Sequence, residues 1–231
     1  MTETRPKSSA TENGEAREAI FASIRSSLFA SEPYDAEHRK HHEQTETRLG
    51  SQSFQLSLEA LIDNFKKNLE SVGGHCMVVS DDREAANQGR TIIEKIGAKK
   101  IAISDSVLVS SVIGSETGIE FIENAKVETL FDCDLGITSA QWAIAETGTL
   151  VLESDLESHR LTSLVPPVHL CLIKAVNIRQ TLGEILELTS RELSRTITFI
   201  TGASRTSDIE LTLAIGVHGP GELYVIIIAD Q

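Results

Sequence analysis

The chain has 231 residues, 40% of them hydrophobic, which is enough for one large domain or two small ones with a substantial buried core. Its 21 lysines and arginines stand against 34 aspartates and glutamates, and the net charge of −13 disfavours binding to nucleic acids or to anionic membrane surfaces. The longest apolar runs, such as YVIIIA at 224–229, are far too short to span a bilayer. The N-terminus also lacks the apolar core of a secretory signal, so we expect a cytoplasmic protein without a membrane span.

Three cysteines limit the metal chemistry that the chain could support. Cys76, Cys133 and Cys171 are widely spaced, and no two of them form a CxxC pair. Zinc sites and iron–sulfur clusters need several such ligands at close spacing. We therefore expect three reduced, buried thiols and no metal or cluster held by this chain alone.

The N-terminal quarter of the sequence differs in character from the rest. Residues 1–14 are polar and predict a disordered tail. Residues 15–53 predict a helix followed by a polar linker, because apolar residues recur at helical spacing at Ala16, Ile20, Ile24 and Leu28. A linker this long suggests that the helix packs on a distant face or on another subunit. Its HRKHHE segment favours a solvated linker over a metal site.

Residues 54–231 form the main domain, in which helices and strands take turns. Ser57 is expected to cap a helix that ends at Gly73, and Asp81 or Asp82 opens a second helix that ends at Gly97. Apolar runs predict strands at 76–80, 99–104, 127–131, 135–138, 149–154, 169–174, 196–201 and 223–228. Most of these runs are apolar throughout, which is typical of strands buried on both faces. The pattern predicts an α/β fold, a layered sheet with flanking helices, whose site lies at the carboxyl ends of the strands.

The first segment with possible chemistry is AETGTLVLES at 145–154. Thr147 and Gly148 between two apolar runs predict a hairpin turn, with Glu146 at its mouth. A plain turn explains these residues. Alternatively, Glu146 acts as a catalytic acid, base or nucleophile, with Thr147 beside it as a binding residue.

The second segment is ESHRLTSLVPPVHLCLI at 157–173. Arg160 lies in a loop and is a candidate anion ligand, although an ordinary surface cation is an equal alternative. Two prolines at 166–167 fix an extended entry into the next strand. His169 alternates with leucines in that strand, which favours a core histidine.

The third segment joins TGASRTSDIE at 201–210 to GVHGPGE at 216–222. Ser204 and Thr206 offer hydroxyls and backbone amides, and Arg205 offers a forked cation, which together suit a carboxylate or a phosphate. His218 in the tight glycine loop is a further candidate. Neither GxGxxG, GxxxxGK[ST], HExxH nor GxSxG occurs, so the residues alone indicate an α/β domain with a site for a small anion.

These segments also resemble a known family. GITSAQWAIAETGTLVLES at 136–154, SLVPPVHLCLI at 163–173 and TGASRTSDIELTLAIGVHGPGELYVIII at 201–228 are similar to the LUD-domain family, specifically its lactate-utilisation protein C type. The resemblance covers about residues 54–229 and implies a fold similar to the NagB/RpiA/CoA-transferase group. It also implies a role in oxidising L-lactate to pyruvate, together with partner subunits that carry iron–sulfur clusters.

Three hypotheses for function follow. The first is a non-redox component of a lactate-utilisation system that binds a small carboxylate, with no cofactor on this chain, since the two electrons must reach another redox centre. The second is an independent enzyme acting on a CoA thioester or a sugar phosphate through Glu146, by analogy of fold. The third is a scaffold whose N-terminal helix docks the partner subunits. The sequence leaves open whether this chain is an enzyme.

Overall fold

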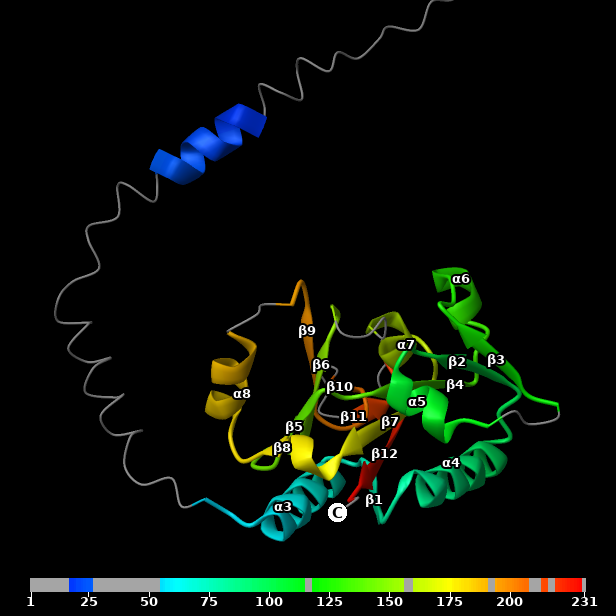
Figure 1. The fold of residues 1–231 in the computed structure, drawn as a ribbon. Coiled ribbons are helices and arrows are strands. Elements are labelled where there is room, and N and C mark those ends of the chain that lie inside the picture. The colour runs from blue at the N-terminus through cyan, green and yellow to red at the C-terminus, as the bar shows by residue number, and fades with distance from the viewer. Residues whose placement is uncertain are drawn as a thin grey trace, which may run out of the picture. The chain divides into compact units, whose positions relative to one another are not determined.

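The computed structural model describes residues 17–26, 55–114, 118–155, 160–190, 194–207, 213–215 and 219–229. The chain divides into two units, residues 1–54 and 55–231. In the first unit, residues 17–26 are helical and expose Ile20, Phe21 and Ile24 (Figure 1). The guanidinium of Arg17 lies 5.5 Å from the centre of the Phe21 ring. The histidines of the expected linker lie outside the described residues.

The second unit is built on a parallel sheet. Within the described residues its strand order is β1 (His75–Val79), β12 (Glu222–Ile228), β7 (Val168–Lys174), β4 (Leu135–Ser139), β2 (Lys100–Ile103) and β3 (Glu120–Glu123) (Figure 1). Every neighbouring pair in this order is parallel. All residues of β4 are buried, as are nearly all of β7 and β12, which confirms the prediction of strands covered on both faces.

Helices and a second sheet cover the two faces of the main sheet. Helices α4 (Asp82–Ile96) and α5 (Val107–Val112) pack on one face, with Ile93 and Val109 against Ile137 of β4. On the other face lie α3 (Leu58–Ser71), α6 (Val127–Leu130), α7 (Arg160–Leu164) and a second sheet. The α/β fold with helices on both faces is therefore confirmed.

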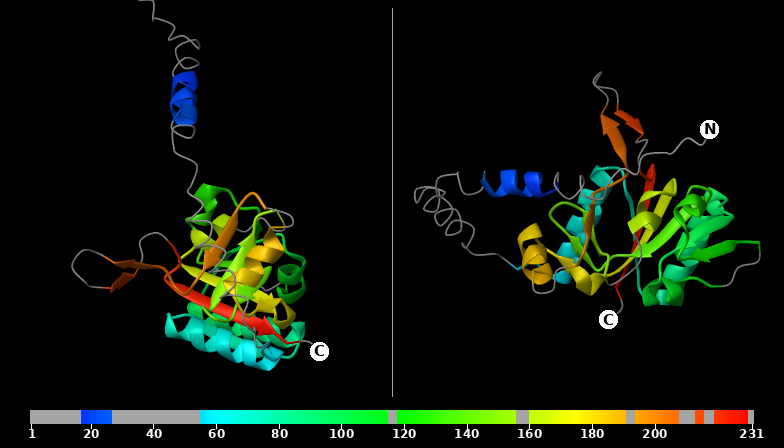
Figure 2. Two further views of the ribbon diagram at one scale, coloured as in Figure 1. Left: turned by 90° about the vertical axis from the view of Figure 1, so that its left-hand side faces the viewer. Right: turned by 90° about the horizontal axis from the view of Figure 1, so that it is seen from above.

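The second sheet has the order β8 (Ile178–Arg179), β5 (Trp142–Ile144), β6 (Thr149–Glu153) and β9 (Ile197–Ile200). A 3₁₀ turn (Ala175–Asn177) leads from β7 into β8, and α8 (Leu182–Thr189) lies between β8 and β9. Strands β5 and β6 are antiparallel around the turn predicted at Thr147–Gly148, where Gly148 N donates to Ile144 O. A separate hairpin of β10 (Arg205–Ser207) and β11 (Leu213–Ile215) projects from the body in both views of Figure 2.

Local capping explains where the two best-predicted helices begin and end. The Ser57 side chain accepts a hydrogen bond from Ala60 N at the start of α3. Asp81 does the same for Glu84 N at the start of α4, which ends at Gly97 with φ 70°. Both helices were predicted within two residues of these bounds.

The prediction of a strand at 127–131 was wrong. Residues Val127–Leu130 form the short helix α6. The reason is topological, because β3 and β4 are parallel strands of one sheet on either side of β2, and a parallel connection must cross over a face. The run TGASRTSDIE was expected to be a loop, but its residues Arg205–Ser207 form strand β10.

Candidate functional site

A cavity of about 310 Å³ lies between the main sheet and the end of β9. It is lined by α7, by the second residues of β7 and β12, by residues 199–205, and by Gly219 and Pro220. His169 and Leu223, the second residues of their strands, mark this as the amino edge of the parallel sheet. The expectation of a site at the carboxyl ends is therefore wrong for this cavity, because the segments around it mostly enter strands instead of leaving them.

A glycine allows α7 to approach the sheet at this edge. A Cβ at Gly136 in β4 would overlap the carbonyl oxygen of Thr162 in α7. The same Cβ would stand 3.2 Å from Pro166 Cγ. The absence of a side chain at this position lets α7 pack directly on β4 and form one wall of the cavity.

Arg205 lines the cavity and reaches the end of α3. Its Nη2 donates a hydrogen bond of 3.1 Å to the carbonyl oxygen of Val72, the C-cap residue of that helix. The guanidinium lies against Gly73, whose φ is 84° and where any side chain would overlap it. A guanidinium has five N–H donors, so this contact positions Arg205 and leaves most of its donor capacity for other acceptors. The side chain is exposed.

The two halves of the third segment meet at the cavity, as their pairing predicted. Ser204 N donates to Pro220 O at 2.8 Å. A Cβ at Gly219 would stand 3.0 Å from both Cβ and Oγ of Ser204. Thus Ser204 and Arg205 share the cavity with the residues that enter β12.

A chain of hydroxyls connects the hairpin turn to the cavity. Thr147 Oγ1 lies 2.7 Å from Thr149 Oγ1, which lies 2.7 Å from Thr201 Oγ1. Only Thr201 of the three lines the cavity. Thr147 is therefore linked to the cavity through Thr149 and does not itself face it.

Other sequence-predicted residues lie elsewhere. Glu146 Oε1 accepts a 2.8 Å hydrogen bond from Leu182 N, the first residue of α8, which places its carboxylate at that helix start and outside the cavity lining. Arg160 is the exposed first residue of α7, and its carbonyl oxygen accepts from Ser163 Oγ at 3.0 Å. Thr206 lies in β10 opposite Ala214, but its side chain is outside the described part of the structure, as is all of His218.

His169, which the sequence analysis assigned to the core, also lines the cavity. It is completely buried, as expected of a core histidine, yet it lines the cavity. Its Nε2 lies 2.8 Å from Thr138 Oγ1 on β4. Because α7 precedes β7, the second position of β7 lies beside the approach of α7, and that proximity could not be inferred from the alternation of side chains.

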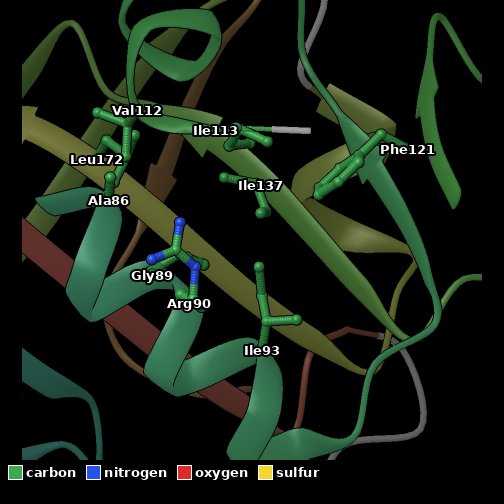
Figure 3. Close-up of a pocket in the computed structure, with 11 residues that line it drawn as sticks. Ala86, Gly89, Arg90, Ile93, Val112, Ile113, Phe121, Ile137 and Leu172 are labelled. Atoms are coloured by element: carbon green, nitrogen blue, oxygen red, sulfur yellow. The ribbon is translucent and has the colours of Figure 1, made fainter. Parts of the chain in front are cut away.

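A second pocket, between α4, α5 and the sheet, is too small for a ligand (Figure 3). Its volume is about 20 Å³, room for roughly one water molecule. Apart from Arg90 its lining is apolar or glycine, including Ile93 and Ile137. We interpret it as a packing defect beside Gly89.

The three cysteines are buried thiols. Burial raises the pKa of Cys76 to about 12, and burial also raises the pKa of Cys133. Across the described part of the chain there is no group of three or more histidine, cysteine or acidic side chains that could hold a metal ion. The same residues contain no helix long and apolar enough to cross a membrane.

Residues 62–228, most of the second unit, match the LUD domain. The chain belongs to the LUD domain family. Its relatives include an uncharacterised protein of Neisseria meningitidis, 40% identical over 46% of this chain and 47% of that protein. Lactate utilization protein C of Deinococcus radiodurans is 39% identical over 41% of this chain and 46% of its own length. The chain thus spans about half the length of these two relatives.

A longer match comes from lactate utilization protein C of Anoxybacillus flavithermus, which is 26% identical over 80% of this chain and 77% of that protein. A crystal structure of a DUF162 family protein from Deinococcus radiodurans has a TM-score of 0.58 and 24% identity. It covers 75% of this chain and 99% of the other. The likeness supports the fold described for this LUD domain.

The described lining of the cavity combines one cation with hydroxyl groups. Arg205 supplies a cation, while Ser163, Thr201 and Ser204 supply hydroxyls. Among the described residues no aspartate or glutamate lines the cavity, although the chain as a whole carries −13. A guanidinium matches the geometry of a carboxylate.

Proposed function

We propose that this protein is a component of a cytoplasmic lactate-utilisation system and that it binds a small carboxylate in the cavity. The observation that carries the proposal is the position of Arg205 in a cavity of about 310 Å³ without acidic lining among the described residues. Lactate is proposed because relatives of this chain are named lactate utilization protein C. Both lactate and pyruvate are small carboxylates.

Partner proteins are part of the same proposal. Oxidising lactate to pyruvate releases two electrons, which a redox centre must accept. We assign that centre to iron–sulfur clusters on partner subunits, because the sequence of this chain has no CxxC pair. Its buried thiols, Cys76 above all with its raised pKa, resist the ionisation that cluster ligation requires.

Ligand-induced thermal stabilisation tests the carboxylate site. L-lactate or pyruvate at about 100 times its Kd should stabilise the wild type by roughly 2.7 kcal/mol, which raises the Tm by several degrees. The shift should vanish in Arg205→Ala. Arg195→Ala is the matched control, since Arg195 is exposed, lies 3.8 Å from Asp155 and does not line the cavity. Equal shifts in the two variants, or none in the wild type, would contradict the proposal.

A growth experiment tests the pathway. A strain that lacks this protein should fail to grow on L-lactate, recover with the wild type or Arg195→Ala, and remain impaired with Arg205→Ala. Normal growth of the deletion strain on lactate would show that the protein has another role.

A further inference from the structure

The cavity is larger than lactate alone requires. Its volume of about 310 Å³ corresponds to roughly ten water molecules, each of which takes about 30 Å³ in the liquid. A three-carbon acid such as L-lactate takes the place of only about four of them. Pockets that enclose larger ligands begin at roughly 300 Å³. A lactate bound to Arg205 would therefore leave roughly half of the cavity or more to solvent.

The described lining of the cavity has a polar and an apolar part. Ser204 and Arg205 supply a hydroxyl and a guanidinium. The branched side chains of Leu164, Ile200 and Leu223 form an apolar wall. Leu223 belongs to the hydrophobic core that joins the two sheets and α3, and Ile200 packs against that core. The apolar wall is therefore continuous with the interior of the protein.

Burial places the two parts at different depths. Arg205 is exposed, whereas Leu223 is 1% exposed, and Leu164 and Ile200 are half-buried. The guanidinium therefore lies at the opening of the cavity and the apolar wall lies deeper. An apolar group that covers the wall would remove further apolar surface from water, which favours binding.

The polar side chains on the buried side of the cavity are bonded within the protein. Ser163 Oγ donates to the carbonyl oxygen of Arg160 at 3.0 Å, and His169 Nε2 lies 2.8 Å from Thr138 Oγ1. Ser163 and His169 are both completely buried. A ligand group beside them need not supply a hydrogen bond, so an apolar group can lie there without the penalty of an unpaired buried polar group.

We infer that the cavity binds carboxylic acids with a branched apolar side chain of about four carbons. The carboxylate lies on Arg205 at the opening, and the side chain lies against the apolar wall. The inference rests on the proposed carboxylate site and names its ligand class. L-lactate is a short member of this class. The cavity favours larger relatives such as L-2-hydroxy-4-methylpentanoate, in which an isobutyl group replaces the methyl group of lactate.

Calorimetric titration of the full-length protein with these two acids tests the inference, because they share one head group. Burial of one methylene tightens binding by roughly fourfold, and the isobutyl group adds about three carbons. We expect the Kd for L-2-hydroxy-4-methylpentanoate to be at least about tenfold lower than the Kd for L-lactate. Arg205→Ala should weaken the binding of both acids. A Kd for L-lactate equal to or below that for the larger acid would overturn the inference and leave the carboxylate site intact.

Variants of the apolar wall test where the side chain lies. Leu164→Asn keeps the approximate size of the residue but makes it polar, so the ratio of the two Kd values should fall to about three or less. The Kd for L-lactate should change by less than about twofold, since its methyl group covers little of the wall. Ile200→Thr introduces a hydroxyl on the same wall and should lower the ratio too, which keeps the test valid if Leu164→Asn does not fold.

Leu186→Asn is the matched control for the wall variants. Leu186 is 52% exposed on α8 and does not line the cavity, so the ratio should stay at the wild-type value. A wild-type ratio in both wall variants would place the side chain of the ligand elsewhere and overturn the inference. If neither acid binds the wild type, or if Arg205→Ala binds both acids unchanged, the carboxylate site fails and the inference fails with it.

Discussion

Gly148, in the turn between β5 and β6, lies directly against the backbone of Leu69 in α3. An added Cβ would overlap Leu69 N and would stand 2.7 Å from Asn68 C and from Leu69 Cα. Asn68 Nδ2 also donates to Ala145 O at 2.8 Å, next to the same turn. The turn that begins the hydroxyl chain is therefore fixed to the helix whose C-terminal end holds Arg205.

Replacing Gly148 should destabilise the protein strongly. Gly148→Ala places a side chain at φ 65° and into the α3 backbone, so conformational strain and overpacking add. We expect a loss of roughly 2–4 kcal/mol in the free energy of unfolding, measured by urea denaturation. Gly97→Ala is the control, since Gly97 has φ 70° but no heavy atom within 4 Å of its added Cβ. The control should lose only about 1 kcal/mol, and equal losses would refute the packing argument.

Filling the small cavity in Figure 3 should stabilise the protein. Gly89 is buried inside α4, and no heavy atom lies within 4 Å of an added Cβ. Gly89→Ala removes the helix penalty of glycine without a clash, so we expect a gain of about 1 kcal/mol and a Tm higher by roughly 2–4 °C. Gly89→Leu exceeds a cavity of about 20 Å³ and should be less stable than Gly89→Ala. An alanine variant no more stable than the wild type would disprove this.

Glu146 should contribute to stability more than to ligand binding. Its carboxylate accepts from Leu182 N at the positive end of α8, so Glu146→Gln should cost about 0.3–1 kcal/mol in low salt and less in high salt. Retention of lactate binding in Glu146→Gln is expected. Acyl-CoA turnover that disappears in this variant would favour the alternative enzyme hypothesis.

The features that could be predicted from the sequence are those that a few neighbouring residues determine. The cap at Ser57, the helix start at Asp81 or Asp82, the helix end at Gly97 and the turn at Gly148 depend on a few neighbouring residues, and they were predicted correctly. The apolar strands were found for the same reason, since burial on both faces leaves a continuous apolar run.

The site depended on contacts between distant residues. The approach of α7 to Gly136 and the contact of Arg205 with Val72 connect parts of the chain that no short pattern relates. From the sequence, Ser204 and Arg205 were predicted as site residues only because their segment was joined to the glycine loop at 216–222. It assigned His169 to the core, which is correct, but not to the cavity, because burial in a strand and a position beside an internal cavity give the same apolar neighbours.

The buried thiol of Cys76 should make the protein less stable in alkali. Burial raises its pKa from the usual value of 9.0 to about 12. Between these values the unfolded chain loses the thiol proton while the folded chain keeps it, so the free energy of unfolding falls as pH rises, by at most about 1.4 kcal/mol per pH unit. From pH 9 to 10.5, urea denaturation should show a loss up to roughly 2 kcal/mol larger in the wild type than in Cys76→Ala. Cys133→Ala should retain this part of the slope, since it leaves Cys76 in place. Identical slopes in the wild type and Cys76→Ala would show that Cys76 titrates normally in the folded protein.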